Sequence, residues 1–190
     1  MLVSFARRFS VIALLSLCAV APAKAEIEKF IYHCEDQKQL CPFFRASVTV
    51  PDGWVEDKEA SRHFNAVILL PKGVAFNDSQ ATIYAIALYN RKKQPISDFL
   101  PDGIKDWKSR AKDAKITSLP DLPRDAGKPA FVRRAFEAAS LSEQGYEFQA
   151  VTTDGDKDGN EFVVTITLSA NSKDALKSAE PAYLAILGKY

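Results

Sequence analysis

The segment from residue 146 to residue 169 constrains the fold of this 190-residue chain more than any other. It contains two runs of alternating apolar and polar residues, separated by an acidic, glycine-containing loop from Asp154 to Asn160. Strict alternation with a period of two is typical of β-strands with one well-buried face. The segment therefore predicts a long β-hairpin, whose buried face consists of Tyr146, Phe148 and Ala150 in the first arm and Phe162, Val164, Ile166 and Leu168 in the second.

The chain continues after this hairpin with a helical pattern. Asn171 and Ser172 can cap the start of a helix, and apolar residues recur at helical spacing from Lys173 to Tyr190. Pro181 is expected to break or kink this helix. Its apolar stripe can lie on the buried face of the hairpin.

Two nearly continuous apolar runs, Phe64 to Leu70 and Ile83 to Tyr89, do not alternate. Such runs are typical of central strands that are covered on both faces. A second helix is predicted from Ser97 to Ala111, with Asp98 as its cap and Trp107 in its apolar stripe. The predicted fold class is therefore α+β, with a mostly antiparallel β-sheet sandwiched between helical layers in an α/β/α arrangement.

Three further strands complete the predicted sheet. Residues 46–50 form a short β-branched run that stops at a Pro-Asp-Gly turn, and 115–122 reads as an edge strand that ends in prolines. Residues 131–139 are expected to pair with the arm that starts at Tyr146. Their charged residues Arg133, Arg134 and Glu137 suit a solvated strand face, with an anion pocket as the alternative.

The first 25 residues have the pattern of a secretory signal peptide. Arg7 and Arg8 precede an apolar stretch that is too short to span a bilayer, and Ala23-Lys24-Ala25 is a cleavage site of the A-x-A type. We expect cleavage after Ala25 and a periplasmic or secreted product without a transmembrane span. The predicted organisation is a signal peptide over 1–25, an N-terminal segment over 26–45, and a single domain over 46–190.

The charge of the mature chain excludes one class of partner. The whole chain carries 25 basic and 24 acidic side chains, and the signal peptide removes Arg7, Arg8 and Lys24, which leaves a net charge of about −2. A nucleic-acid-binding protein would show a basic stripe, which this near-neutral chain does not have. The expected partner is another exported or envelope protein, or a small ligand.

Cys34 and Cys41 are the two cysteines that remain after signal cleavage. Thiols oxidise in the expected compartment, so the spacing favours a disulfide that closes a small loop. The alternative is a metal site that adds His33, Glu35 and Asp36 to the two sulfurs, although no second pair of ligands follows in the manner of a structural zinc site.

The acidic hairpin loop resembles the start of a calcium-binding loop. Asp154, Asp156 and Asp158, followed by Gly159, match the pattern D-x-D-x-D-G, in which alternate carboxylates bind one cation. The twelfth position is Thr165, so the bidentate glutamate is missing. The pattern favours a polar hairpin turn, with weak calcium binding as the alternative and no other cofactor expected.

Catalytic motifs are absent from the sequence. His33 and His63 are the only histidines, and neither lies in a G-x-S-x-G, H-E-x-x-H or phosphate-binding glycine pattern. We therefore expect a non-catalytic binding or accessory module. The alternative is a small periplasmic enzyme whose site uses carboxylates or His63.

Several of these segments together resemble the PsbP-like and Mog-type family, including exported bacterial relatives of the DcrB kind. The resemblance rests on residues 48–54, which read as an apolar strand followed by P-x-G-W, on the helix of residues 98–111, and on the two hairpin segments 146–148 and 163–170. It implies an antiparallel sheet between helical layers and an accessory or interaction role without a shared catalytic site. The cysteine loop is not part of that pattern.

Overall fold

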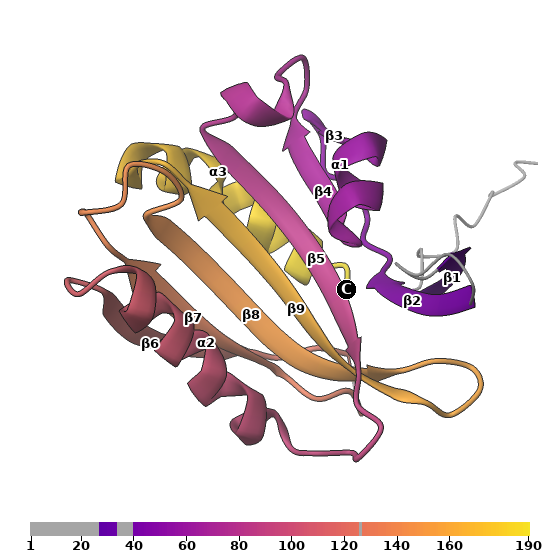
Figure 1. Ribbon diagram of the computed structural model, residues 1–190. Helices are drawn as coiled ribbons and strands as arrows, with labels where there is room; N and C mark the ends of the chain where they lie inside the picture. Colours follow the sequence, from indigo (N-terminus) through magenta and orange to yellow (C-terminus); the bar gives the residue numbers. More distant parts are fainter. Residues whose placement is uncertain (1–26, 34–39, 126) are drawn as a thin grey trace, which may run out of the picture.

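A seven-stranded antiparallel β-sheet forms the body of the protein in the computed structural model, which describes residues 27–33, 40–125 and 127–190 (Figure 1). A separate two-stranded sheet precedes it, made of β1 (Ile27–His33) and β2 (Leu40–Ala46). The order of the strands across the large sheet is β3 (Trp54–Glu56), β4 (Val67–Pro71), β5 (Ala81–Tyr89), β9 (Glu161–Ala170), β8 (Tyr146–Gly155), β7 (Phe131–Glu137) and β6 (Lys115–Leu122).

The predicted hairpin is confirmed as the β8–β9 pair near the middle of the sheet. Its register runs from Tyr146 opposite Ala170 to Gly155 opposite Glu161, so the first arm includes Asp154 and Gly155 of the acidic loop and the second arm begins directly after the loop. The predicted pairing of β7 with β8 and the predicted edge strand of residues 115–122 are also confirmed. Alternation identified β7, β8 and β9 because each has faces of different polarity, and the prolines that end residues 115–122 identified β6 as an edge strand.

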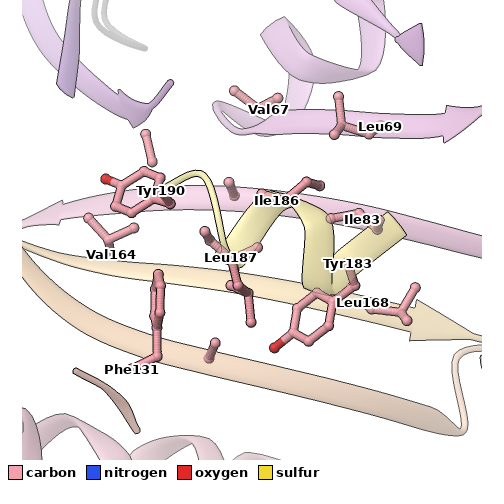
Figure 2. Close-up of a cluster of buried hydrophobic side chains, with 14 of the residues drawn as sticks. Val67, Leu69, Ile83, Phe131, Val164, Leu168, Tyr183, Ile186, Leu187 and Tyr190 are labelled. Atoms are coloured by element: carbon pink, nitrogen blue, oxygen red, sulfur yellow. The ribbon is translucent and has the colours of Figure 1, made fainter. Parts of the chain in front are cut away.

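One face of the sheet packs against α3 (Lys173–Leu187) and forms the main hydrophobic core (Figure 2). Tyr183, Ile186 and Leu187 of the helix point toward apolar side chains of β4, β5 and β9. As predicted, Ser172 caps the helix, because its hydroxyl accepts a hydrogen bond from the Ala175 N–H at 3.1 Å. Pro181 lies inside α3 and does not end it.

The opposite face carries two helices that lie apart from each other. The short α1 (Lys58–Phe64) packs on β4. The longer α2 (Ile96–Arg110) packs on β7 and β8, where Trp107 stacks on Phe136 with ring centroids 5.3 Å apart. The N-cap of α2 is Pro95 and not the predicted Asp98, which lies in the first turn.

The predicted α/β/α sandwich is wrong, because the protein is β-rich and its helices do not form layers. Within the described residues there are nine strands and three α-helices, the longest of 15 residues. A helix of that length covers about 22 Å by 10 Å, whereas seven strands span about 29 Å. On the face that α1 and α2 share, Thr82, Tyr84 and Ile86 of β5 stay partly exposed between the two helices.

The apolar runs caused this error. The run from Ile83 to Tyr89 indicated a strand covered on both faces, but β5 alternates between buried residues such as Ala85 and partly exposed residues such as Tyr84. An apolar side chain can lie at a partly open surface, so hydrophobicity alone does not require a helix above it.

Two of the predicted strand boundaries are also wrong. Residues 58–64 form α1 because Asp57 caps its start and Asn65, with a φ of 50°, ends it in the left-handed conformation, so the strand begins only at Val67. Residues 47–50 form no strand; β2 ends at Ala46, and Val48 packs against the core without a ladder partner. β2 therefore crosses the predicted domain boundary between residues 45 and 46.

The predicted signal peptide over 1–25 lies outside the described residues. Among the helices that the structure does describe, none combines the length and apolarity needed to span a membrane.

Candidate functional site

A buried carboxylate lies on the sheet face between α1 and α2. Glu147 of β8 is only 4% exposed. Its Oε2 accepts a hydrogen bond from Trp107 Nε1 at 3.3 Å, and its Oε1 accepts one from the Tyr84 hydroxyl at 3.4 Å. The Arg110 guanidinium lies over the Trp107 ring, with Cζ 4.6 Å from the ring centroid. Side chains of two strands, β8 and β5, and of the helix α2 therefore meet around a single acid.

Burial governs the electrostatics of this cluster. Removal from water raises the pKa of Glu147 above its usual range, while the positive charge of Arg110 and the hydrogen bonds from Trp107 and Tyr84 oppose that rise. The pKa of the Tyr84 hydroxyl is also raised, first by burial and then by the neighbouring Glu147 charge. Tyr84 therefore remains a neutral hydrogen-bond donor at physiological pH.

Two hydroxyl groups of β9 extend the polar cluster along the sheet. Ser169 pairs with Glu147 on one side and with Thr82 on the other, and Thr167 pairs with Tyr84. Ser169 is 1% exposed and Thr167 is fully buried. Ser169 helps to stabilise the Glu147 charge, yet neither hydroxyl makes a hydrogen bond of good geometry with the described residues.

Ser169 also lines a pocket of about 330 Å³ at the start of β5 and the end of β9, which we call the Ser169 pocket. This volume is at the lower end of the range for small-molecule sites. The other hydroxyl and amide side chains that line it belong to Asn77, Ser79, Gln80, Thr82, Gln144 and Asn171. The pocket therefore offers many groups that both donate and accept hydrogen bonds.

Hydrogen bonds between three segments preform the Ser169 pocket. The Asn171 N–H donates to the Gln80 carbonyl at 3.0 Å, which joins the end of β9 to the start of β5. The Asn171 Oδ1 accepts from the Gln144 N–H at 2.9 Å, which attaches the loop before β8. Ser79 donates its hydroxyl to the Ala81 carbonyl at 2.6 Å. The lining residues are thus held before any ligand arrives.

Sequence reasoning did not find this site. Glu147, Thr167 and Ser169 belong to the polar faces of the two predicted arms, and such faces are usually solvated. The available signal was an acid that alternates with Tyr146 and Phe148, in a chain that also has a helix carrying Trp107. That signal is weak because only the packing of α2 onto β8 removes Glu147 from water.

The three aspartates of the acidic loop have separate environments. Asp154 forms an ion pair with Arg124, with Oδ2 and Nη2 2.6 Å apart. Asp156 accepts hydrogen bonds from the Asp158 N–H and from Asn160, and the Asn160 bonds lower the pKa of Asp156. Among the described residues, no group of three or more His, Cys, Asp or Glu side chains is placed to hold a metal ion. Weak calcium binding by this loop stays the alternative to the favoured polar hairpin turn.

The loop also borders the largest of the hollows described here. Asp156, Lys157 and Asp158 face Phe30 and Phe44 of the β1–β2 hairpin across a groove of about 570 Å³. Phe44 packs on the buried Phe162, with ring centroids 4.8 Å apart. This groove has an aromatic floor and a rim of mixed charge.

His63, the candidate for an enzymatic site, is exposed on α1. Its ring packs edge-on against Phe64, with centroids 4.7 Å apart, beside a depression of about 460 Å³ that Asp57 and Glu59 also line. The Asp57 carboxylate already accepts hydrogen bonds from the Glu59 and Ala60 N–H groups as the cap of α1. Its Oδ1 therefore serves the helix cap, and among the described hydrogen bonds none joins Asp57 to the His63 ring.

The predicted disulfide between Cys34 and Cys41 cannot be placed, because Cys34 and the Cys41 side chain lie outside the described residues. The same holds for the alternative metal site, since it needs Glu35, Asp36 and the side chain of His33.

The charged residues of β7 do not form one anion pocket. Arg134 donates a hydrogen bond to the Leu100 carbonyl of α2 at 3.1 Å, while Glu137 forms an ion pair with Lys173 of α3 at 2.6 Å. Adjacent residues of a strand point to opposite faces, so Arg133 lies on the same face as Glu137 and away from Arg134.

No model of a known protein family matches this chain, and no curated protein matches it either. The similarity to PsbP-like and Mog-type proteins therefore depends on the sequence pattern alone.

Proposed function

We propose that the protein is an exported, non-catalytic binding module that holds a small ligand in the Ser169 pocket. The observation that carries this proposal is the buried Ser169 hydroxyl, which lies in a preformed polar pocket without a hydrogen bond of good geometry to the described residues. The Ser169 hydroxyl interacts with the Glu147 carboxylate, but its oxygen can also accept hydrogen bonds, and a buried acceptor without a donor costs free energy. A ligand that donates a hydrogen bond to Ser169 would recover this free energy, and this gain would favour ligand binding in the pocket.

The accessibility of the acidic residue favours binding over catalysis. A general acid or base has to come within hydrogen-bond reach of its substrate. Glu147 has the raised pKa of a candidate acid, but Trp107 covers it and the side chains that line the pocket do not include it. Glu147 would therefore act on a ligand only indirectly, by positioning the Ser169 hydroxyl.

An enzyme based on His63 is the less favoured alternative. His63 is exposed, and the nearby Asp57 carboxylate is occupied as a helix cap. The accessory role that the PsbP-like resemblance implies is compatible with the binding proposal, and the expected exported location makes envelope components the available ligands.

Binding in the Ser169 pocket can be tested by mapping amide shifts in NMR spectra while a mixed panel of small polar compounds is added. We expect saturable shifts at Gln80, Thr82, Gln144 and Ser169. Gln80→Trp should abolish them, because Gln80 is exposed at the pocket and an indole would fill the space. Lys72→Trp is the matched control, since Lys72 is also exposed but does not line the pocket. Shifts that persist in Gln80→Trp would contradict the proposal.

A further inference from the structure

The chemistry of the Ser169 pocket indicates which ligands it can bind. Eight of its nine lining residues are polar, and most of these carry a hydroxyl or an amide. Such groups both donate and accept hydrogen bonds, as the hydroxyls of a ligand do. An apolar ligand would leave these groups unpaired, which costs free energy for each buried one.

The charges around the pocket disfavour an anionic ligand. Among the described residues that line it there is no lysine or arginine, whereas Glu143 is exposed at its rim. Glu147 is paired with Ser169 on the adjacent strand β8. Any negative charge that it carries therefore adds to the negative potential that an anionic ligand would meet in the pocket. A phosphate or carboxylate site would instead supply cationic donors.

The pocket also has one apolar surface. Phe76 of the 3₁₀ helix η1 (Phe76–Asp78) lines it and packs on Phe64, with ring centroids 5.5 Å apart. A saccharide ring has hydroxyls at its edge and C–H groups on its faces, and C–H groups pack favourably on an aromatic ring. One aromatic ring among hydroxyls and amides fits both parts of such a molecule.

From these observations we infer that the Ser169 pocket binds a neutral polyhydroxylated ligand, a saccharide or a polyol. This inference rests on the proposed function, because it names the ligand class of the same site. The buried Ser169 hydroxyl would bond to a ligand hydroxyl, the amides of Gln144 and Asn171 would contact others, and Phe76 would pack on the C–H groups of the ligand.

Three probes of one skeleton test the charge preference. Glucose, glucuronate and glucosamine are similar in size but neutral, anionic and cationic, and each can be titrated into the protein of residues 26–190 by NMR. We expect glucose to bind with a dissociation constant of about 1 mM or tighter, and glucuronate at least tenfold more weakly. N-acetylglucosamine and mannitol serve as further neutral probes, and at least one of the three neutral compounds should shift the Ser169 and Gln144 amides.

Two variants test the contacts. Ser169→Ala should weaken binding of the best neutral probe about fivefold, which is the effect of one lost hydrogen bond. Thr165→Ala is the matched control, because Thr165 lies on the same strand and face but does not line the pocket, and its affinity should not change. Thermal unfolding of both variants shows whether Ser169→Ala is folded; if it is not, Gln144→Ala replaces it, since Gln144 is exposed.

The outcomes separate the two proposals. Tighter binding of glucuronate or glucosamine than of every neutral probe would overturn the ligand class and leave the binding function intact. The ligand class would also be wrong, and the binding function right, if compounds of the mixed panel bind at the Ser169 pocket and none of the neutral probes does. If nothing binds there, both the ligand class and the proposed function are wrong.

Discussion

Glu147 shows how a single residue can combine a stability cost with a structural role. A carboxylate that is 4% exposed has lost most of its hydration, and two hydrogen bonds to its oxygens only partly replace the water. Those bonds also satisfy the Trp107 indole N–H, which has no other hydrogen bond among the described contacts. Glu147 therefore connects α2 to the centre of the sheet, at a free-energy cost that depends on its ionisation.

The pH dependence of unfolding should reveal this cost. Because the pKa of Glu147 is raised in the folded state, the folded protein binds the proton more tightly, so its stability is highest below the unfolded pKa of about 4.3 and falls as pH rises toward the folded pKa. Glu147→Gln keeps an acceptor for Trp107 and removes the charge. We expect its unfolding free energy in urea, relative to the unmodified protein, to increase from pH 4 upward and to level off above the folded pKa of Glu147.

Glu147→Ala separates the charge from the hydrogen bond. Both variants remove the charge, but only Glu147→Ala leaves the Trp107 N–H without this partner. Glu147→Ala should therefore be less stable than Glu147→Gln by about 1–3 kcal/mol at every pH. A Glu147→Gln protein that loses stability relative to the unmodified protein as pH rises would show that the carboxylate is stabilised in the fold.

The acidic loop is the element whose role the tertiary structure most clearly alters. The side chain of Arg124 is 1% exposed and forms an ion pair with Asp154. It also donates hydrogen bonds to the Thr152 hydroxyl and to the Tyr190 carbonyl. The base of the loop is thus anchored to the segment before β7 and to the end of the chain. Asp156 accepts hydrogen bonds inside the loop itself.

Calcium would have to replace these contacts to use the two aspartates. We therefore expect calorimetric titration of the metal-free protein to show no calcium affinity tighter than about 10⁻⁴ M, the strong end of the range for extracellular modules. Asp156→Asn, which keeps the side-chain shape, is the control. Tighter binding that disappears in Asp156→Asn would establish the calcium site that the D-x-D-x-D-G pattern suggests.

The expected location of the whole molecule depends on the N-terminal part of the chain. If the first 25 residues are a signal peptide, the exported protein starts at Glu26 and its two remaining cysteines, Cys34 and Cys41, meet an oxidising compartment. Intact mass of the exported protein should equal that of residues 26–190 less two hydrogens, with no alkylation before reduction. A mass that includes residues 1–25, or two alkylated thiols without reduction, would contradict this expectation.

The sequence by itself determined the local structure where one physical pattern dominates. Alternation placed the β8–β9 hairpin, the turn residues placed the edge strand β6, and helical spacing with a Ser172 cap placed α3. These features depend on residues that are close in the chain. The missed α1 shows the limit, because its seven residues lack a long apolar stripe and depend on Asp57 and Asn65 at their ends.

Only the tertiary structure decided how much of the sheet the helices cover and which polar residues become buried. The sequence pattern of Glu147, Thr167 and Ser169 is that of a solvated strand face; Trp107 packs over Glu147 only because α2 crosses back onto β8. The Ser169 pocket likewise joins residues from 76 to 171, which no local pattern relates. Burial is a property of neighbours that are distant in sequence, and the chemistry of this site depends on burial.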